Sequence, residues 1–276
     1  YQTHLLRRSY REGGKVKNET VGNLSHLPPH LVALIRSSLH GETHAVTDPT
    51  SEFEIIASFH HGHVHAVRAT MKRLGFENLV ASRPSRERDL VLAMVAARIV
   101  DPFSKLATRR WWNTTTLGED LGVAHADVDE LYLAMDWLLV RQGRIERKLA
   151  ARHLDENCLA LYDLSSSYFE GVTCPLAALG HSRDGKKGKL QVNYGLLTNT
   201  RGCPVSVSVY SGNTADPTTL VPEVKKVKRA FGLKEFVMVG DRGMIGQKQI
   251  DQLKDIEGLA WIAALKSVQI RKLVEH

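Results

Sequence analysis

The chain has 276 residues, of which 43% are hydrophobic and 24% are charged, with 21 glycines and 9 prolines. These values exclude a disordered chain, a collagen and a coiled coil, and the lack of any apolar run of roughly 18 residues excludes a membrane span. The 37 Lys and Arg residues exceed the 30 Asp and Glu residues by a net charge of +7, which favours an anionic partner.

Length, cysteines and termini set further expectations. At about 150 residues per domain, the length predicts about two domains. Cys158, Cys174 and Cys203 are odd in number and lack any C-x-x-C spacing, which argues against disulfides and a zinc ribbon and favours a reducing cytoplasm. The chain begins at Tyr1 without a Met and ends at His276 just after a strand-like segment. We therefore expect a fragment of a longer protein.

Residues 1–82 predict a small N-terminal α+β element. HLLRRSYR (4–11) and KVKNETV (15–21) flank the Gly13-Gly14 pair, and this pattern indicates a β-hairpin. In LVALIRSSL (31–39), which follows two prolines, the apolar residues recur at helical spacing. We therefore expect a hairpin followed by a short helix.

The rest of this element is mixed. FEIIASF (53–59) indicates a strand, and residues 63–74 predict a helix that Gly75 ends. The start of this helix carries a run of histidines: His60, His61, His63 and His65. Zinc sites closed by local histidines alone are rare, and no cysteine lies near. We therefore predict no zinc site there.

Residues 83–157 predict a helical region throughout. Asp101-Pro102 stops a first helix. A second, long helix opens with Asp127 and Glu130 at the spacing of a capping box, and its apolar residues keep helical spacing to Leu149. This region is the second predicted domain.

From Cys158 onward the pattern changes to strands, and the positive charge increases. CLALYDLSSSYF (158–169), VNYGLLTN (192–199) and PVSVSVY (204–210) predict three antiparallel strands. This part of the chain holds 16 Lys and Arg against 11 Asp and Glu. Most of the net positive charge therefore lies in the third predicted domain.

Helices and further strands follow this meander. Asp216-Pro217 opens a helix as N-cap and first position, and Gly232 ends it. EFVMVGD (235–241) predicts a short buried strand, and LAWIAAL (259–265) predicts a fifth strand after another helix. The order β-β-β-α-β-α-β is that of an RNase H-like α/β fold with a mixed sheet. We predict this fold for residues 158–276, preceded by the hairpin element and the helical domain.

Two acidic residues stand in the apolar strands: Asp163 in the first and Asp241 at the end of the fourth. An ionised carboxylate in a buried run is costly unless it pairs or binds a cation. Strands one and four are neighbours in this fold, so the two like charges should converge and need a neutralising metal. Carboxylates suit Mg²⁺ or Mn²⁺, and two such ions about 3.5–4 Å apart can drive attack on a phosphodiester. Either aspartate alone would more often be a turn or cap residue.

Several blocks of the sequence resemble a known family. In the strand-rich part they are YDLSSSYFEG (162–171), GHSRDGKKGKLQVNYGLL (180–197), SGNTADPTTL (211–220) and VGDRGMI (239–245). Earlier blocks are HLLRRSYREGGKVKNETVGNLSHLPP (4–29), SRERDLVLAMVAARIVDPFSKLAT (85–108) and AMDWLL (134–139). Through these blocks nearly the whole chain closely resembles a bacterial insertion-sequence transposase of the DDE superfamily.

This resemblance implies an RNase H-like catalytic core with three carboxylates and two Mg²⁺ or Mn²⁺ ions. It implies cleavage and strand transfer of DNA at the inverted-repeat ends of the element. Matched residue by residue, Asp163 resembles the first catalytic, metal-binding carboxylate and Asp241 the second. The implied partners are double-stranded DNA, at the element's ends and at the target, and a second copy in a homodimer on that DNA. The implied location is the bacterial cytoplasm, at the nucleoid.

The third carboxylate of the family has no counterpart in this chain. In the branch that the chain resembles, a β-rich insertion follows the fifth strand, and a later helix carries Tyr-x₂-Arg-x₃-Glu-x₆-Lys. KSVQIRKLVEH (266–276) resembles only the start of that insertion. Glu257 and Glu275 lie in no such pattern, so neither is predicted to be a ligand. We expect a chain that stops before its third carboxylate.

Basic residues near the two aspartates are candidates for DNA contact: Arg183, Lys186, Lys187, Lys189 and Arg242. The first four lie in a Gly-rich segment, where flexible cationic side chains could reach phosphates. The alternative is that this segment is simply a solvated loop. In residues 83–157, the region predicted to recognise the element's ends, Trp111 and Trp112 could stack on bases. Such residues are more commonly helix-packing anchors.

Two rival functions stay open at this stage. A catalytically inert remnant of such a transposase would bind DNA in a salt-sensitive way but show no metal-dependent nicking. A different RNase H-like nuclease, using another carboxylate, would cut RNA–DNA hybrids without any preference for inverted-repeat ends.

Overall fold

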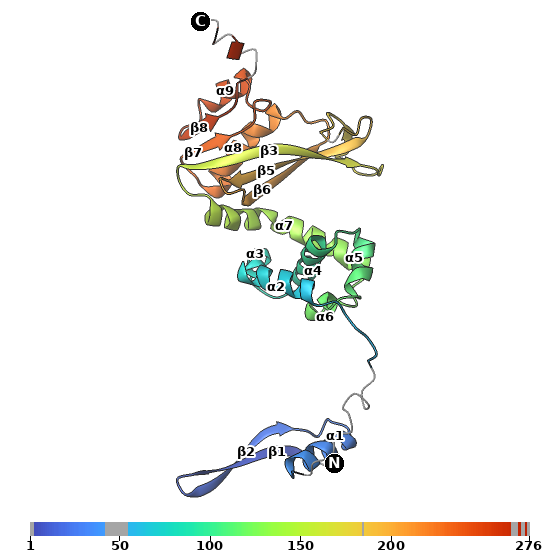
Figure 1. Ribbon diagram of the computed structural model, residues 1–276. Helices are drawn as coiled ribbons and strands as arrows, with labels where there is room; N and C mark the ends of the chain where they lie inside the picture. Colours follow the sequence, from blue (N-terminus) through green and yellow to red (C-terminus); the bar gives the residue numbers. More distant parts are fainter. Residues whose placement is uncertain (1–2, 42–54, 184, 266–269, 272–273, 275–276) are drawn as a thin grey trace. The chain divides into compact units, whose positions relative to one another are not determined.

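The computed structural model describes residues 3–41, 55–183, 185–265, 270–271 and 274. The chain divides into two compact units, Tyr1–Ser58 and Phe59–His276 (Figure 1). The predicted domain boundaries, after residues 82 and 157, do not coincide with this division and remain predictions. In the described part of the chain, no helix is both long enough and apolar enough to cross a membrane.

The first unit is a two-stranded antiparallel ribbon followed by a helix. Its elements are β1 (Leu5–Glu12), β2 (Lys15–Asn23) and α1 (Pro29–Leu39). Gly13 and Gly14 turn the chain with φ of 58° and 78°, the positive values that a tight two-residue hairpin turn needs. The predicted hairpin and helix are therefore both present.

The prediction of a strand over residues 53–59 is wrong for residues 55–59, the part that the structure describes. Residues 55–59 form no strand. Ile55 and Ile56 are 87% and 91% exposed, so this apolar run has no neighbouring strand to pair with. Residues 53 and 54 lie outside the described residues. A run of apolar residues indicates a strand only where a partner strand completes its hydrogen bonds.

The second unit begins with six helices around a common core. They are α2 (Gly62–Arg73), α3 (Phe76–Val80), α4 (Arg86–Val100), α5 (Lys105–Trp112), α6 (Leu117–Asp120) and α7 (Val128–His153). The predicted capping box of α7 is present, because the Asp127 and Glu130 side chains each accept from the other's backbone N–H. The Trp112 side chain is fully buried in this core, so Trp112 is a packing anchor and is not available to stack on bases.

The sheet has the strand order and directions of an RNase H-like fold. Its strands are β3 (Cys158–Phe169), β4 (Ala178–Leu179), β5 (Leu190–Asn199), β6 (Pro204–Ser211), β7 (Phe236–Val239) and β8 (Leu259–Ile262). β5 lies antiparallel between β3 and β6, whereas β7 and β8 run parallel to β3 on its other side. The two-residue strand β4 also pairs with β5 and was not predicted.

Helices cover one face of this sheet. α8 (Pro217–Phe231), α9 (Gln247–Leu253) and the end of α7 bury that face, and Figure 1 shows α7 passing alongside the sheet next to β6. Gly232 ends α8 with a φ of 77°, as predicted. Asp216 and Pro217 take the predicted N-cap and first positions of α8, although the Asp216 side chain makes no cap hydrogen bond. The helix predicted before the fifth strand is α9, which ends at Leu253.

Candidate active site

The two predicted aspartates line the same cavity. Residues alternate along β3, so Tyr162 and Leu164 are buried while Asp163 is exposed on the opposite face. The parallel register pairs Leu161 with Val239, and continuing it by two residues sets Asp163 opposite Asp241. Both residues line a cavity of about 610 Å³. The expectation that the carboxylates lie in buried runs is wrong, since both are exposed.

The turn after β7 orients the Asp241 carboxylate. Its Oδ1 accepts hydrogen bonds of 2.8 Å from the backbone N–H groups of Gly243 and Met244, and Met244 is buried. A Cβ at position 243 would lie 3.2 Å from this oxygen, closer than a side chain comfortably allows. A glycine there lets the backbone hold this carboxylate oxygen closely.

The residue before Asp163 anchors β3 from the opposite face. The Tyr162 ring is buried, which raises the pKa of its hydroxyl, and that hydroxyl lies 3.2 Å from the Tyr210 hydroxyl. Gly195 on β5 leaves room for the ring, because a Cβ there would lie 2.1 Å from the Tyr162 hydroxyl. Asp163 itself makes no ion pair with any described residue. The strand is therefore fixed, while its carboxylate is left available.

The donor set of this cavity fits a hard divalent cation. Mg²⁺ is commonly held by one or two carboxylates together with water and substrate phosphates, and the cavity supplies two carboxylates. Within the described ranges, no group of three or more His, Cys, Asp or Glu side chains could hold a metal. Glu257 precedes β8, at the end opposite to the one that pairs with Val239, so it does not approach Asp241. Glu275 lies outside the described residues.

Arg183, a predicted DNA contact, is engaged elsewhere. Its Nη2 atom lies 2.5 Å from Asp216 Oδ1, and both side chains are only partly exposed. The backbone of Asp216 is helical instead of extended, so its side chain is not placed to cap α8. Arg183 therefore fastens the Gly-rich segment to the start of α8, and the expectation of a free cation at this position does not hold for the described structure.

The other predicted cations lie on the surface. Lys189 approaches Glu170 at 3.7 Å, an exposed pair of the kind that contributes little. Lys186 stands 5.8 Å from the centre of the Tyr168 ring. Lys187 is exposed, and Arg242 is exposed in the turn directly after Asp241. The cavity-lining residues include none of these cations, so Arg242 is placed near Asp241 by its position in the chain alone.

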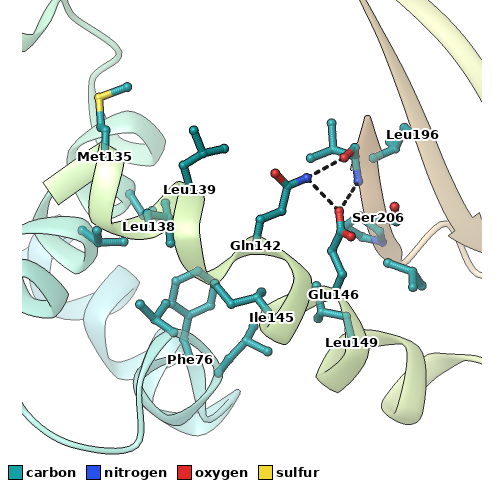
Figure 2. Close-up of a pocket in the computed structure, with 17 residues that line it drawn as sticks. Phe76, Met135, Leu138, Leu139, Gln142, Ile145, Glu146, Leu149, Leu196 and Ser206 are labelled. Atoms are coloured by element: carbon teal, nitrogen blue, oxygen red, sulfur yellow. Dashed lines mark hydrogen bonds between the residues drawn. The ribbon is translucent and has the colours of Figure 1, made fainter. Parts of the chain in front are cut away.

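Sequence reasoning missed a second acidic cluster at the edge of the sheet (Figure 2). Glu146 on α7 accepts hydrogen bonds from Val207 N at 3.1 Å and from Gln142 Nε2 at 2.9 Å. Gln142 Nε2 also donates to Val207 O at 2.7 Å. Two helix side chains thus complete the hydrogen bonds of the edge strand β6, in the place that a neighbouring strand would take.

The buried polar cluster continues beneath β6. Glu223 accepts hydrogen bonds from the Ser206 and Ser208 hydroxyls at 3.1 and 3.0 Å, and burial raises its pKa. Lys226 lies between the two glutamates and pairs with Glu146 at 2.9 Å. The Lys226 side chain is therefore partly buried in this cluster. The local signal that could have found this cluster is Glu223 itself, which sits on the helix face that carries Val224 and Val227.

A second cavity, of about 490 Å³, lies beside this cluster between α7, α3, α4 and the edge of the sheet. Its walls are mostly apolar, as Figure 2 shows. Its two polar residues on α7, Gln142 and Glu146, are already bonded to Val207. This cavity therefore belongs to a structural junction and offers no free titratable group for chemistry.

Two family models match parts of the chain. The model of the N-terminal domain of IS1634 family transposases matches residues 1–48, and the model of the transposase DDE domain matches residues 166–273. The two matches show that each of these parts of the chain is similar to a transposase domain. The predicted resemblance is confirmed.

Two solved transposase structures share limited similarity with the chain. The chain resembles piggyBac transposase in a synaptic complex with hairpin DNA, with 11% identity and a TM-score of 0.41, over 73% of this chain and 48% of that one. It resembles Mos1 transposase in a paired-end complex, with 8% identity and a TM-score of 0.28, over 70% and 72% of the chains. The chain thus spans about half the length of the piggyBac protein. No curated protein sequence matches it.

Proposed function

We propose that the protein is a DDE-type transposase that cleaves and joins DNA strands at the ends of an insertion sequence, with Asp163 and Asp241 as catalytic metal ligands. The observation that carries this proposal is that both carboxylates line one cavity, where the neighbouring parallel strands β3 and β7 bring them together. The carboxyl ends of strands are where open α/β sheets bind their ligands. The match of residues 166–273 to the transposase DDE domain model supports the same proposal.

The residues of the cavity would divide the work between holding and orienting. Mg²⁺ or Mn²⁺ bound by Asp163 and Asp241 would supply activation of a water or a 3′-hydroxyl and stabilisation of the leaving oxygen. The N–H groups of Gly243 and Met244 fix one oxygen of Asp241, so the other is presented in a set direction. Arg242, exposed beside Asp241, would contact a phosphate of the DNA backbone.

The partners and location follow from this proposal. The substrates would be double-stranded DNA at the inverted-repeat ends and at the target, bound by a homodimer. The net charge of +7 supports a polyanionic partner. The protein would act in the bacterial cytoplasm at the nucleoid, and the free state of Cys158, Cys174 and Cys203 supports a reducing compartment.

Cleavage assays of the complete enzyme test the proposal. Asp163→Asn and Asp241→Asn should each abolish Mg²⁺- or Mn²⁺-dependent cleavage of DNA with inverted-repeat ends, and both should leave DNA binding nearly intact. Asp251→Asn is a matched control, because Asp251 is an exposed aspartate that pairs with Lys254 on another part of the domain. Undiminished cleavage by either of the first two variants would overturn the proposal. Salt-sensitive DNA binding without any cleavage by the wild type would favour the inert remnant instead.

A further inference from the structure

The β1–β2 ribbon lacks cover on both of its faces. Every residue of it from Arg7 to Val21 is exposed. Val32 on α1 is the only buried hydrophobic residue among those described in the first unit, and the cavity next to α1 reaches along β1 only to Leu6. An isolated two-stranded hairpin is marginally stable in water. A long ribbon that the unit itself leaves uncovered is therefore a candidate for binding a partner.

The antiparallel register sorts the ribbon's side chains into two faces. One face, called the paired face, carries Arg8, Tyr10, Glu12, Lys15, Lys17 and Glu19. The other face, called the open face, carries Arg7, Ser9, Arg11, Val16, Asn18 and Thr20. The two faces differ in chemistry, since only the paired face has acidic residues.

On the paired face, acidic side chains hold the cations. Arg8 pairs with Glu19, directly opposite in the register, at 3.0 Å. Lys17 pairs diagonally with Glu12, and the Arg8 guanidinium also stands 5.5 Å from the centre of the Tyr10 ring. These exposed pairs add little stability, but they satisfy the charges of this face within the ribbon itself.

The open face offers hydrogen-bond donors that have no acceptor. Arg7 and Arg11 make no ion pair with any described residue, and no acidic residue shares their face. The Ser9 hydroxyl donates to Asn18 Oδ1 at 2.6 Å, which uses the acceptor of that amide and leaves its N–H groups for another partner. Two guanidinium groups thus flank a central amide donor. A complementary ligand must be anionic and rich in acceptors.

We propose that the open face is a DNA-binding surface that enters the major groove of a duplex. This proposal rests on the proposed function, in which DNA is the substrate. The groove is about 12 Å wide and admits a two-stranded ribbon. A rise of about 3.4 Å per residue sets Arg7 and Arg11 roughly 14 Å apart along β1. Arg7 and Arg11 contact phosphates, while the Asn18 amide, opposite Ser9 and so between them, faces the base edges, where an Asn is suited to adenine.

Binding of the full 276-residue chain to a labelled mixed-sequence duplex, measured over a range of salt concentrations, tests this surface. The test variant is Arg7→Gln/Arg11→Gln. The matched control is Arg8→Gln/Lys17→Gln, which removes the same charge from the opposite face. Losing two phosphate contacts should weaken binding at least about tenfold and lower the slope of log K against log salt by about 1.8. The control should change both quantities much less.

A chemical probe separates groove binding from general charge attraction. Wild-type chain should protect guanine N7, which lies in the major groove, from dimethyl sulfate, and the Arg7→Gln/Arg11→Gln variant should lose that protection. Equal weakening by both double variants, or unchanged binding by the open-face variant, would overturn the ribbon proposal alone. A wild-type chain without salt-sensitive DNA binding would overturn the proposed function as well. Far-UV circular dichroism checks folding, and the two single substitutions replace the double variant if it fails to fold.

Discussion

Two pairs of acidic residues in the second unit lie near the same sheet but differ in their surroundings. Glu146 and Glu223 are buried at the β6 edge, only 5% and 2% exposed. Asp163, in the middle of β3, and Asp241, two residues after the end of β7, are exposed. Both pairs lie next to the sheet, but their hydrogen-bond and ion-pair partners differ. These partners indicate that the first pair is structural and that the second is available for chemistry.

The buried pair is satisfied by the protein itself. Lys226 Nζ lies 2.9 Å from Glu146 Oε2 and 2.6 Å from the Ser206 hydroxyl, and that hydroxyl donates to Glu223. This network joins α7 and α8 across β6. A buried charge is tolerated only when it is paired and hydrogen-bonded in this way. The cluster therefore holds the helical region against the sheet.

The exposed pair is left open to solution. Asp241 accepts two backbone hydrogen bonds through one oxygen, and the Asp163 carboxylate has no ion-pair partner among the described residues. Two like charges that face the same cavity repel each other, and a bound cation would remove this repulsion. The comparison thus separates carboxylates that hold the fold together from carboxylates that await a ligand.

The largest effect on stability is expected at Lys226. Lys226→Ala leaves Glu146 and Glu223 without the cation that lies between them, and a broken buried ion pair costs about 3 kcal/mol when its exposure is small. The Lys226 side chain is 26% exposed, which keeps the expected loss at the lower end of that class. Urea denaturation measures it. Lys225→Ala, at an exposed neighbouring position, should change the unfolding free energy by no more than about 0.5 kcal/mol. Equal losses in the two variants would contradict the structural role of the cluster.

A smaller, pH-dependent effect is expected at Glu223. Burial raises the pKa of Glu223, and this effect exceeds the lowering by Lys226 and by the two serine hydroxyls. The folded chain then holds this proton more tightly than the unfolded chain does, so stability falls as the pH rises from the ordinary glutamate pKa through the raised one. Glu223→Gln removes this loss. Its unfolding free energy relative to wild type should therefore improve steadily with pH above 4.5.

A matched control tests whether this trend belongs to burial. Glu257→Gln removes an exposed carboxylate of the same unit and should show no such trend in denaturation series between pH 4.5 and 7.5. A flat difference for Glu223→Gln over that range would mean that the glutamate is not penalised by burial. The buried and exposed carboxylates would then be less different than their surroundings suggest.

Much of the sheet could be predicted from local pattern. The run at residues 158–169 coincides with β3 (Cys158–Phe169), because its alternation of buried and exposed positions is a property of neighbouring residues. The convergence of Asp163 and Asp241 could be predicted as well, since it follows from strand order. Their exposure could not, because it depends on which face the helices cover.

The errors concern contacts between residues far apart in the chain. Arg183 meets Asp216, which lies 33 positions further on, and a loop cation carries no local sign of such a partner. Lys226 reaches Glu146 in the same way. Periodicity assigns Lys226 to a helix face but does not indicate that a neighbouring helix lies beside it. Local pattern therefore predicts elements better than it predicts which charges they pair.

Divalent-ion binding tests the central claim, that Asp163 and Asp241 form the metal site, most directly. Without metal, Asp163→Asn should match the wild-type unfolding free energy within about 0.5 kcal/mol, because the side chain is exposed. With Mn²⁺ at ten times its dissociation constant, the wild type and the control Asp251→Asn should gain about 1.4 kcal/mol. Asp163→Asn should gain almost nothing. The same response to Mn²⁺ in the wild type and in Asp163→Asn would contradict the claim.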